Sequence, residues 1–138
     1  MWWVYALLSA LFASLTAIFA KMGVDNTNSD LATGIRTIVI LVLVWSIILF
    51  KGEIREVQAV SKQSLFFLII SGIATGLSWL FYFKALQIGN VSQVAPVDKL
   101  SVALTILLAA LFLGESLDWK TITGALLIIA GTFVLIGK

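Results

Sequence analysis

Five long apolar runs, separated by short polar connections, set the strongest limit on how this chain can fold. The runs cover Trp2–Ala20, Leu31–Phe50, Leu65–Phe83, Val94–Leu113 and Thr121–Gly137. A helix needs ~20 mainly apolar residues to cross a bilayer, and thinning of the bilayer can accommodate the slightly short last run. The sequence therefore predicts an all-α membrane protein with five transmembrane helices, and the lipid bilayer is its first expected partner.

Composition agrees with insertion in a membrane. Of the 138 residues, 61% are hydrophobic and 12% are charged, and the mean hydropathy is +1.11. Soluble domains contain about 45–50% apolar and about 25% charged residues. The short connections leave no room for a soluble domain, so we expect residues 1–138 to form a single domain. The first run lacks a basic n-region and a cleavage signal, which indicates a retained helix rather than a signal peptide.

The residue types that are missing exclude several functions. The chain contains no histidine and no cysteine, which removes Cys/His metal sites, thiol or Ser–His catalysis, and disulfides. A single carboxylate within the apolar runs is a poor acid–base set, so we expect no enzyme and no cofactor. The net charge of +2 is small and scattered, which argues against nucleic acid as a partner.

Asp98 is the only carboxylate inside an apolar run. It lies in the stretch from Asn90 to Glu115, together with the only proline, Pro96, and an adjacent base, Lys99. A charge on a spanning helix costs about 2.5–3.5 kcal/mol even on the lenient insertion scales. A segment that served only as an anchor would do better with leucine, so we expect Asp98 to have a functional role.

Topology brings charged and aromatic residues of three helices to one depth. With five spans, the second helix starts, the third ends and the fourth starts at the same membrane face. That arrangement predicts that Arg36, Trp79, Tyr82, Asp98 and Lys99 converge near that face. Lys99 follows Asp98 directly, about 100° round the helix, so the two do not easily share a partner, and Asp98 with Arg36 is the better candidate pair.

Polar side chains also form a stripe on each of two helices. The stripes are Ser71, Thr75, Ser78 and Tyr82 on the third helix, and Asp98, Ser101 and Thr105 on the fourth. Spacings of three and four residues place them on one face of each helix. They indicate either hydrogen bonds between helices or the wall of a wet cavity, and the carboxylate favours the cavity.

Each of these residues also has a structural alternative. The long stem of Arg36 can carry its charge to the headgroups, and Trp79 and Tyr82 can belong to the aromatic belt. If Pro96 occupies the first helical position, Asp98 falls in the first turn, where the helix dipole favours a negative charge. That structural role is compatible with a functional one, because many transporters start a helix within the membrane at their binding site.

Loop charges give no strong orientation signal. One face carries Lys51, Arg55, Lys62 and Lys120, and the other carries Lys21, Lys84 and Lys138. Basic loop residues set orientation, so a balanced chain can insert both ways. We therefore expect a homodimer, with the antiparallel arrangement favoured.

The segment from Phe81 to Lys138 resembles part of an EamA-type unit of the drug/metabolite transporter superfamily. The matching features are an aromatic pair before KAL, the helix start VSQVAPV, LGE at Gly114–Glu115, and ITGALLIIAGTFVLI. The alanine-rich first helix and Arg36 are similar as well, so the resemblance covers essentially the whole chain. Typical members have two such units in inverted orientation, which implies that two copies of this chain pair into a ten-helix inverted-repeat transporter.

This chain departs from its relatives in two places. Related helices often carry a proline soon after the position of Leu100, and this one does not. The four-helix small multidrug-resistance proteins use a glutamate in the first helix, which this chain lacks, so their cation-antiport mechanism does not transfer. Glu115 matches the family's GE but lies at a helix end, which suggests a structural or gating role.

We therefore expect a secondary transporter in the cell inner (plasma) membrane. It would move a small polar or amphipathic metabolite or drug by alternating access as a homodimer, with proton coupling as one option. The alternatives are a non-transporting scaffold subunit and a lipid-linked-sugar flippase. The expected substrate-binding or coupling residues are Asp98, Arg36, Lys99, Tyr82, Trp79, Ser101 and Ser78.

Overall fold

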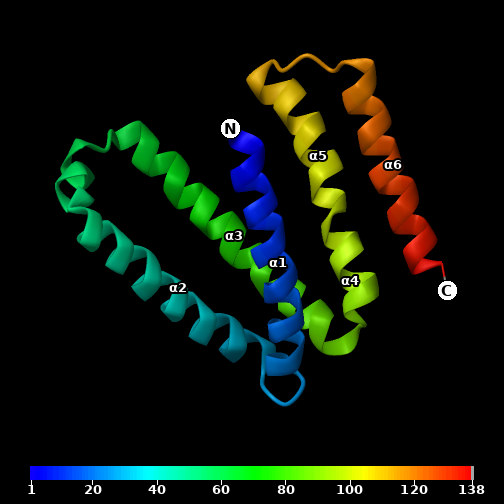
Figure 1. Ribbon diagram of the computed structural model, residues 1–138, viewed down its shortest axis with the longest axis horizontal. Helices are drawn as coiled ribbons and strands as arrows, with labels where there is room; N and C mark the ends of the chain where they lie inside the picture. The colour runs from blue at the N-terminus through cyan, green and yellow to red at the C-terminus, as the bar shows by residue number, and fades with distance from the viewer. Residues whose placement is uncertain (138) are drawn as a thin grey trace. The chain divides into compact units, whose positions relative to one another are not determined.

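The computed structural model describes residues 1–137, and every regular element within them is helical (Figure 1). The α-helices are α1 (Trp2–Val24), α2 (Ser29–Lys51), α3 (Lys62–Ile88), α4 (Val91–Asp98), α5 (Leu100–Leu108) and α6 (Trp119–Ile136). Two other helical segments are a 3-10 helix, η1 (Glu53–Ala59), and a π-helix, η2 (Ala109–Leu113).

Five stretches of the described residues are long and apolar enough to cross a membrane. They are α1, α2, α3, the run from Val91 to Leu113 that comprises α4, α5 and η2, and α6. This result confirms the predicted all-α membrane protein with five transmembrane helices. The observed helices extend past several of the apolar runs, because polar residues such as Lys62 and Gln87 can continue a helix beyond the hydrocarbon core.

The chain divides into two compact units, Phe19–Gln87 and Met1–Ile18 with Ile88–Lys138. The arrangement of residues 1–138 as a single domain stays a prediction. Lys138, which we counted among the basic residues of one face, lies outside the described residues.

In the unit Phe19–Gln87, α2 and α3 are joined through η1 (Figure 1). Asn28 starts α2, because its side-chain oxygen accepts hydrogen bonds from the backbone N–H groups of Asp30 and Leu31. At the other end of α2, Gly52 adopts a φ of 72°, the left-handed conformation that glycine tolerates best. The buried residues of this unit are Ala20, Val24, Ser29, Thr33, Phe83 and Leu86.

Long polar side chains tie the end of α1 to the end of α3 in the same unit. Lys21 Nζ donates to the carbonyl of Leu86 at 2.8 Å. The Gln87 amide nitrogen donates to the carbonyls of Val24 and Thr27 at 3.1 and 2.9 Å. The last carbonyls of a helix have no partner within it. Lys21 satisfies that of Leu86, and Gln87 adds a second bond to that of Val24, which also accepts from the backbone N–H of Thr27 at 3.4 Å.

In the other unit, α6 packs against both α4 and α5. The π-helix η2 ends at Leu113. The next residue, Gly114, has a φ of 69°, which is again the left-handed conformation that glycine tolerates best. Asp118 then starts α6, because its carboxylate accepts a hydrogen bond of 2.8 Å from the backbone N–H of Thr121. The run from α4 to η2 thus lies beside α6 and is joined to it by a five-residue connection at 114–118 (Figure 1).

Candidate functional site

Arg36 lies about two turns into α2, within a spanning stretch. Its guanidinium carbon is 4.3 Å from the centre of the Phe83 ring and 5.3 Å from that of Trp79. Trp79 and Phe83 are four residues apart on α3 and therefore share one face of that helix. Both distances fall within the roughly 6 Å at which a cation is attracted to an aromatic face.

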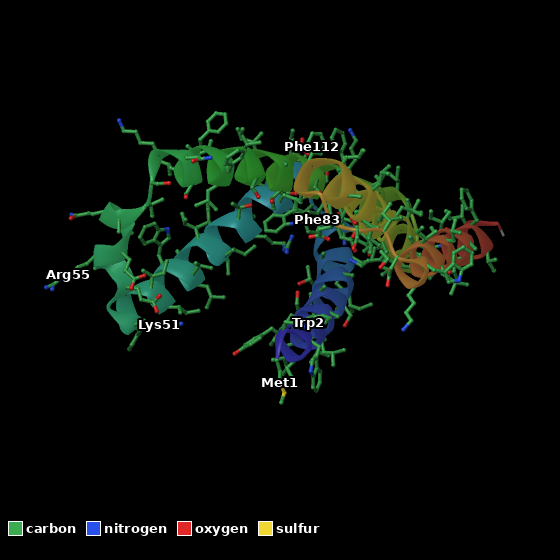
Figure 2. The ribbon with its side chains drawn as sticks, turned by 90° about the horizontal axis from the view of Figure 1, so that it is seen from above. Met1, Trp2, Lys51, Arg55, Phe83 and Phe112 are labelled. Atoms are coloured by element: carbon green, nitrogen blue, oxygen red, sulfur yellow. The ribbon has the colours of Figure 1, made fainter. Side chains whose placement is uncertain are left out.

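Phe83, labelled in Figure 2, is among the most buried side chains of the described residues, at 1% exposure. The arginine therefore lies against the buried part of α3. This arrangement favours an inward role over the alternative in which the side chain extends to the headgroups.

The hydrogen bonding of Arg36 is incomplete. Its Nη1 atom is buried and has no hydrogen-bond partner among the described residues. A guanidinium carries five N–H donors and no acceptor, and ring faces hold its charge without replacing a directional acceptor. Leaving a buried donor unsatisfied is costly, and more so for a charged group. Chemically, this is a group prepared to bind an anion.

Tyr82 and Ser78 complete the expected residues of this unit. Tyr82 is half-buried and close enough to Arg36 to interact with it electrostatically. Its ring meets Phe83 edge to face, with centres 5.7 Å apart. Ser78 is exposed on α3. The structure thus brings Arg36, Trp79 and Tyr82 together.

The surroundings of Asp98 correct one sequence-based interpretation. Pro96 does not occupy the first helical position, because α4 begins at Val91 and contains Pro96 in its interior. Asp98 is consequently the last residue of α4 and not part of a first turn. A proline inside a helix removes one backbone hydrogen bond and often ends or kinks the helix. Here the regular helix is interrupted at Lys99 and resumes as α5 at Leu100.

The interruption holds an ion pair between adjacent residues. Lys99 Nζ lies 3.2 Å from a carboxylate oxygen of Asp98. The side chains are 58% and 35% exposed, respectively, so the pair retains access to its surroundings. A carboxylate with a cation beside it, at a break in a spanning helix, is suited to exchanging one positive partner for another.

Thr132 is a functional candidate that the sequence analysis missed. It is buried on α6, at 3% exposure. Its hydroxyl lies 2.8 Å from the carbonyl of Ile128 in its own helix and 3.2 Å from that of Pro96. The second contact supports the backbone just before the interruption. A threonine in an apolar run that also contains Thr121 and Thr123 was the only signal, and threonines in helices commonly bond their own backbone.

Ser101 is the remaining expected site residue. It lies on α5, three residues after Asp98, and is exposed. Arg36, Trp79, Tyr82 and Ser78 belong to one unit, whereas Asp98, Lys99 and Ser101 belong to the other. The pairing of Arg36 with Asp98 therefore stays a prediction.

No group of three or more metal-ligating side chains occurs in residues 1–137. The chemistry that the described groups can supply is binding of an anion at Arg36 and proton or cation exchange at Asp98. Ionisable groups within transmembrane segments mark substrate or ion pathways by default.

Five stretches apolar enough to span a membrane define a multi-pass membrane protein. The charged residues inside the apolar runs 31–50 and 94–113 are typical of transporters. The profile of the EamA-like transporter family matches residues 1–137, and the chain belongs to that family. The family resemblance drawn from the sequence motifs is thereby confirmed.

Two relatives extend over nearly the whole chain. One, from a Sinorhizobium species, is described as an uncharacterized transporter in the cobO 3′ region. It is 46% identical over 134 residues, which cover 97% of this chain and 95% of the relative. The other, an uncharacterized protein of Methanocaldococcus jannaschii, is 29% identical over 132 residues, which cover 96% and 93%. No solved structure matches this chain. The family and the first relative point to a transporter and not to an enzyme.

Proposed function

We propose that this protein is a secondary transporter that moves a small polar or amphipathic molecule across the cell inner (plasma) membrane. The observation that carries the proposal is the buried Nη1 of Arg36, which has no acceptor among the described residues although it lies within a spanning helix. A charged donor in that state weakens the fold unless a ligand or another partner completes it. Membership of the EamA-like transporter family also supports a transport function.

The interrupted span supports alternating access. Discontinuous helices occur at the binding sites of many transporters, where irregular backbone is tolerated because it lines a cavity or is covered by protein. In this chain the span Val91–Leu113 is interrupted at Lys99, directly beside Asp98. The interruption provides a place at which the two halves of the span can move relative to each other.

Asp98 is proposed to couple transport to protons. Its partner Lys99 is an adjacent residue, so a modest conformational change can separate the two charges. Loss of a neighbouring cation raises the proton affinity of a carboxylate, and its return lowers that affinity. We propose that separation and re-pairing of Asp98 and Lys99 is the conformational step to which proton movement is coupled.

The transporting form is proposed to be an antiparallel homodimer. Two relatives match this chain over 95% and 93% of their own lengths, so they too are one unit long. Pairing two copies would supply the second unit that typical ten-span relatives carry in one chain. The balanced loop charges permit insertion in both orientations.

Solute flux in proteoliposomes tests transport and coupling. The purified protein is reconstituted, a pH gradient is imposed, and uptake is screened across organic anions, neutral solutes and cations. We expect gradient-driven accumulation of at least one class. Solute binding in the absence of any flux would favour the scaffold alternative instead.

Cysteine labelling tests the antiparallel arrangement. Because the chain has no native cysteine, Asn26→Cys places one reporter between α1 and α2. Asn26 is preferred to Asn28, whose side chain starts α2. An impermeant maleimide applied to intact cells should label about half of the molecules if both orientations occur. Labelling of all or none would contradict the antiparallel dimer.

A further inference from the structure

We infer that the solute recognised at Arg36 carries an oxyanion, a carboxylate or a phosphate, beside a planar apolar group. This inference rests on the proposed function and assigns its substrate class. It depends on three features of the unit Phe19–Gln87: how the guanidinium is covered, which of its donors is open, and where the carboxylates of that unit lie.

The aromatic contacts attract the charge of the guanidinium but provide no hydrogen-bond acceptor for its N–H groups. Cations are attracted to ring faces, and Phe83 and Trp79 supply two rings within range of the guanidinium. The N–H donors of a guanidinium lie in its own plane, where they match the two oxygens of a carboxylate or phosphate. The buried Nη1, which has no hydrogen-bond partner among the described residues, is one of these in-plane donors.

The acidic residues of this unit lie outside the apolar runs that contain Arg36 and its two ring partners. The apolar runs 31–50 and 65–83 contain neither aspartate nor glutamate. Of the acidic residues outside them, Asp25 pairs with Lys21 at 3.1 Å and Glu53 pairs with Lys51 at 3.7 Å. Asp30 lies in the first turn of α2, six residues before Arg36, and Glu56 lies in η1. A cationic solute would be repelled, and a neutral solute would leave the charge without a counter-ion. An anion supplies both the charge and the acceptor.

The neighbouring aromatic residues indicate the other part of the solute. Trp79 is half-buried, unlike Phe83, so part of its side chain remains accessible. Tyr82 lies within the same group and is also half-buried. A flat apolar group attached to the oxyanion would pack on this aromatic surface while the oxyanion bonds Arg36.

The chain offers a direct chemical test because it contains only two arginines, Arg36 and Arg55. Arg55 extends outward from the exposed η1 segment (Figure 2) and serves as the internal control. The purified protein in uncharged detergent is treated with phenylglyoxal, which modifies arginine, and the rate at each site is followed by peptide mass spectrometry. Benzoate and phenyl phosphate are the anionic probes, and benzamide and benzylamine are the neutral and cationic ones.

We expect benzoate or phenyl phosphate to slow the modification of Arg36 at least tenfold at saturation and to leave Arg55 unchanged. Benzamide and benzylamine should leave both rates unchanged. The stronger of the two anions assigns the oxyanion as carboxylate or phosphate. Protection of Arg36 by benzamide equal to that by both anions would overturn the inference.

Substitutions measure the same preference by calorimetric binding of the probes. Arg36→Lys should weaken binding of the preferred anion about tenfold, because the ammonium cannot present a planar pair of donors. Arg36→Gln should bind the anion no better than benzamide, whereas Arg55→Lys should match the unsubstituted protein. If Arg36→Gln fails to fold, the protection experiment on the unsubstituted protein still decides the result. Retention of the anion preference in Arg36→Gln would contradict the inference.

Two further experiments test whether the partner of Arg36 is a lipid headgroup or Asp98 instead of a soluble anion. If vesicles containing phosphatidylglycerol protect Arg36 and neither soluble anion does, the partner is a lipid headgroup and the inference is wrong. If Asp98→Asn raises the modification rate of Arg36 and no probe lowers it, the partner is Asp98 and the inference is again wrong. Protection without flux in proteoliposomes would reject the proposed transport while supporting anion recognition.

Discussion

Arg36 and Asp98 show two ways of keeping a charge inside a spanning segment. Arg36 lies on the faces of Phe83 and Trp79, and its Nη1 has no acceptor in the described part of the chain. Asp98 has a cation 3.2 Å away on the next residue. Ring faces attract a cation but leave its directional donors open, whereas an ion pair supplies both attraction and a hydrogen bond. The first arrangement suits ligand binding and the second suits exchange of a proton.

The two places also differ in their backbones. Arg36 lies within an uninterrupted α2, so its position follows that of a rigid helix. Asp98 ends α4 at an interruption that the hydroxyl of Thr132 supports from α6. The comparison predicts that Arg36 acts as a fixed binding group and Asp98 as a group that moves during the cycle.

The largest effect is expected for Asp98→Asn, which tests whether the acid is the moving group. Asparagine keeps the shape and much of the hydrogen bonding but cannot carry the exchangeable charge. We expect proton-driven flux in proteoliposomes to be abolished, while the protein still folds and solute exchange is retained. Asp25→Asn is the matched control, because Asp25 also forms an ion pair with a lysine but lies outside the apolar runs.

Proton-driven flux at the unsubstituted rate in Asp98→Asn would end the assignment of Asp98 as the coupling carboxylate. An unfolded Asp98→Asn protein would instead assign the ion pair a structural role. Asp25→Asn should fold and transport normally in either case, so it shows whether a loss is specific to Asp98 or follows from removing any ion-paired carboxylate.

A graded loss is expected when the fixed group is changed. Arg36→Lys should reduce flux about tenfold, because a lysine keeps the charge but loses the planar fork and its stacking. Arg36→Ala should abolish flux and lower the free energy of unfolding by ~0.5–2 kcal/mol, the range of a cation–π contact. Flux assays and reversible denaturation in detergent measure the two quantities. Normal flux and stability in Arg36→Ala would leave the headgroup alternative standing.

The hydrogen bond from Thr132 to the Pro96 carbonyl, just before the helix interruption at Lys99, provides the next test. Thr132→Val keeps the shape but removes the hydroxyl that contacts the Pro96 carbonyl. We expect the free energy of unfolding to fall by about 1 kcal/mol, the usual net value of a hydrogen bond. Thr123→Val is the control, because the Thr123 hydroxyl bonds only its own helix, at the carbonyl of Trp119. Equal effects of the two substitutions would mean that the Pro96 contact contributes nothing.

The smallest effect is expected for the pH dependence of stability at Asp118, a carboxylate outside the spans. Its charge is held by hydrogen bonds from Thr121. Hydrogen bonds from Thr121 hold the pKa of Asp118 below its ordinary value of 3.8. A lowered pKa in the folded state gives stability that is present above the ordinary value and is lost as the pH falls through the folded value. The melting temperature should therefore fall less below pH ~4 in Asp118→Asn than in the unsubstituted protein. Identical pH profiles would contradict this assignment.

The helices could be predicted from the sequence because the apolar runs are long and the polar connections are short. The proximity of Arg36 to Trp79 and Tyr82 was also predictable, because the alternation of spans places all three residues near the same membrane face. The orientation of Arg36 onto Phe83 was not predicted, because Phe83 is one of many apolar residues and carries no pattern of its own.

Other features depend on backbone groups, which leave little trace in a sequence. The start of α4 at Val91 placed Pro96 inside the helix, and a proline is compatible with either position until the preceding turn is known. The partners of Lys21, Gln87 and Thr132 are carbonyls. Every residue has a carbonyl, so residue types alone do not show which one a side chain will reach.

The bonds from Lys21 and Gln87 have a consequence for how the protein is made. Gln87 follows Val24 by more than 60 residues, yet its amide is a partner of the Val24 carbonyl. During synthesis, α1 and α2 leave the ribosome before the residues that complete the end of α1 exist. A nascent chain that stops short of Gln87 must therefore leave the Thr27 carbonyl to water or to another partner, and the Val24 carbonyl has only the backbone N–H of Thr27. Only when the end of α3 has been synthesised can Gln87 donate to the carbonyls of Val24 and Thr27.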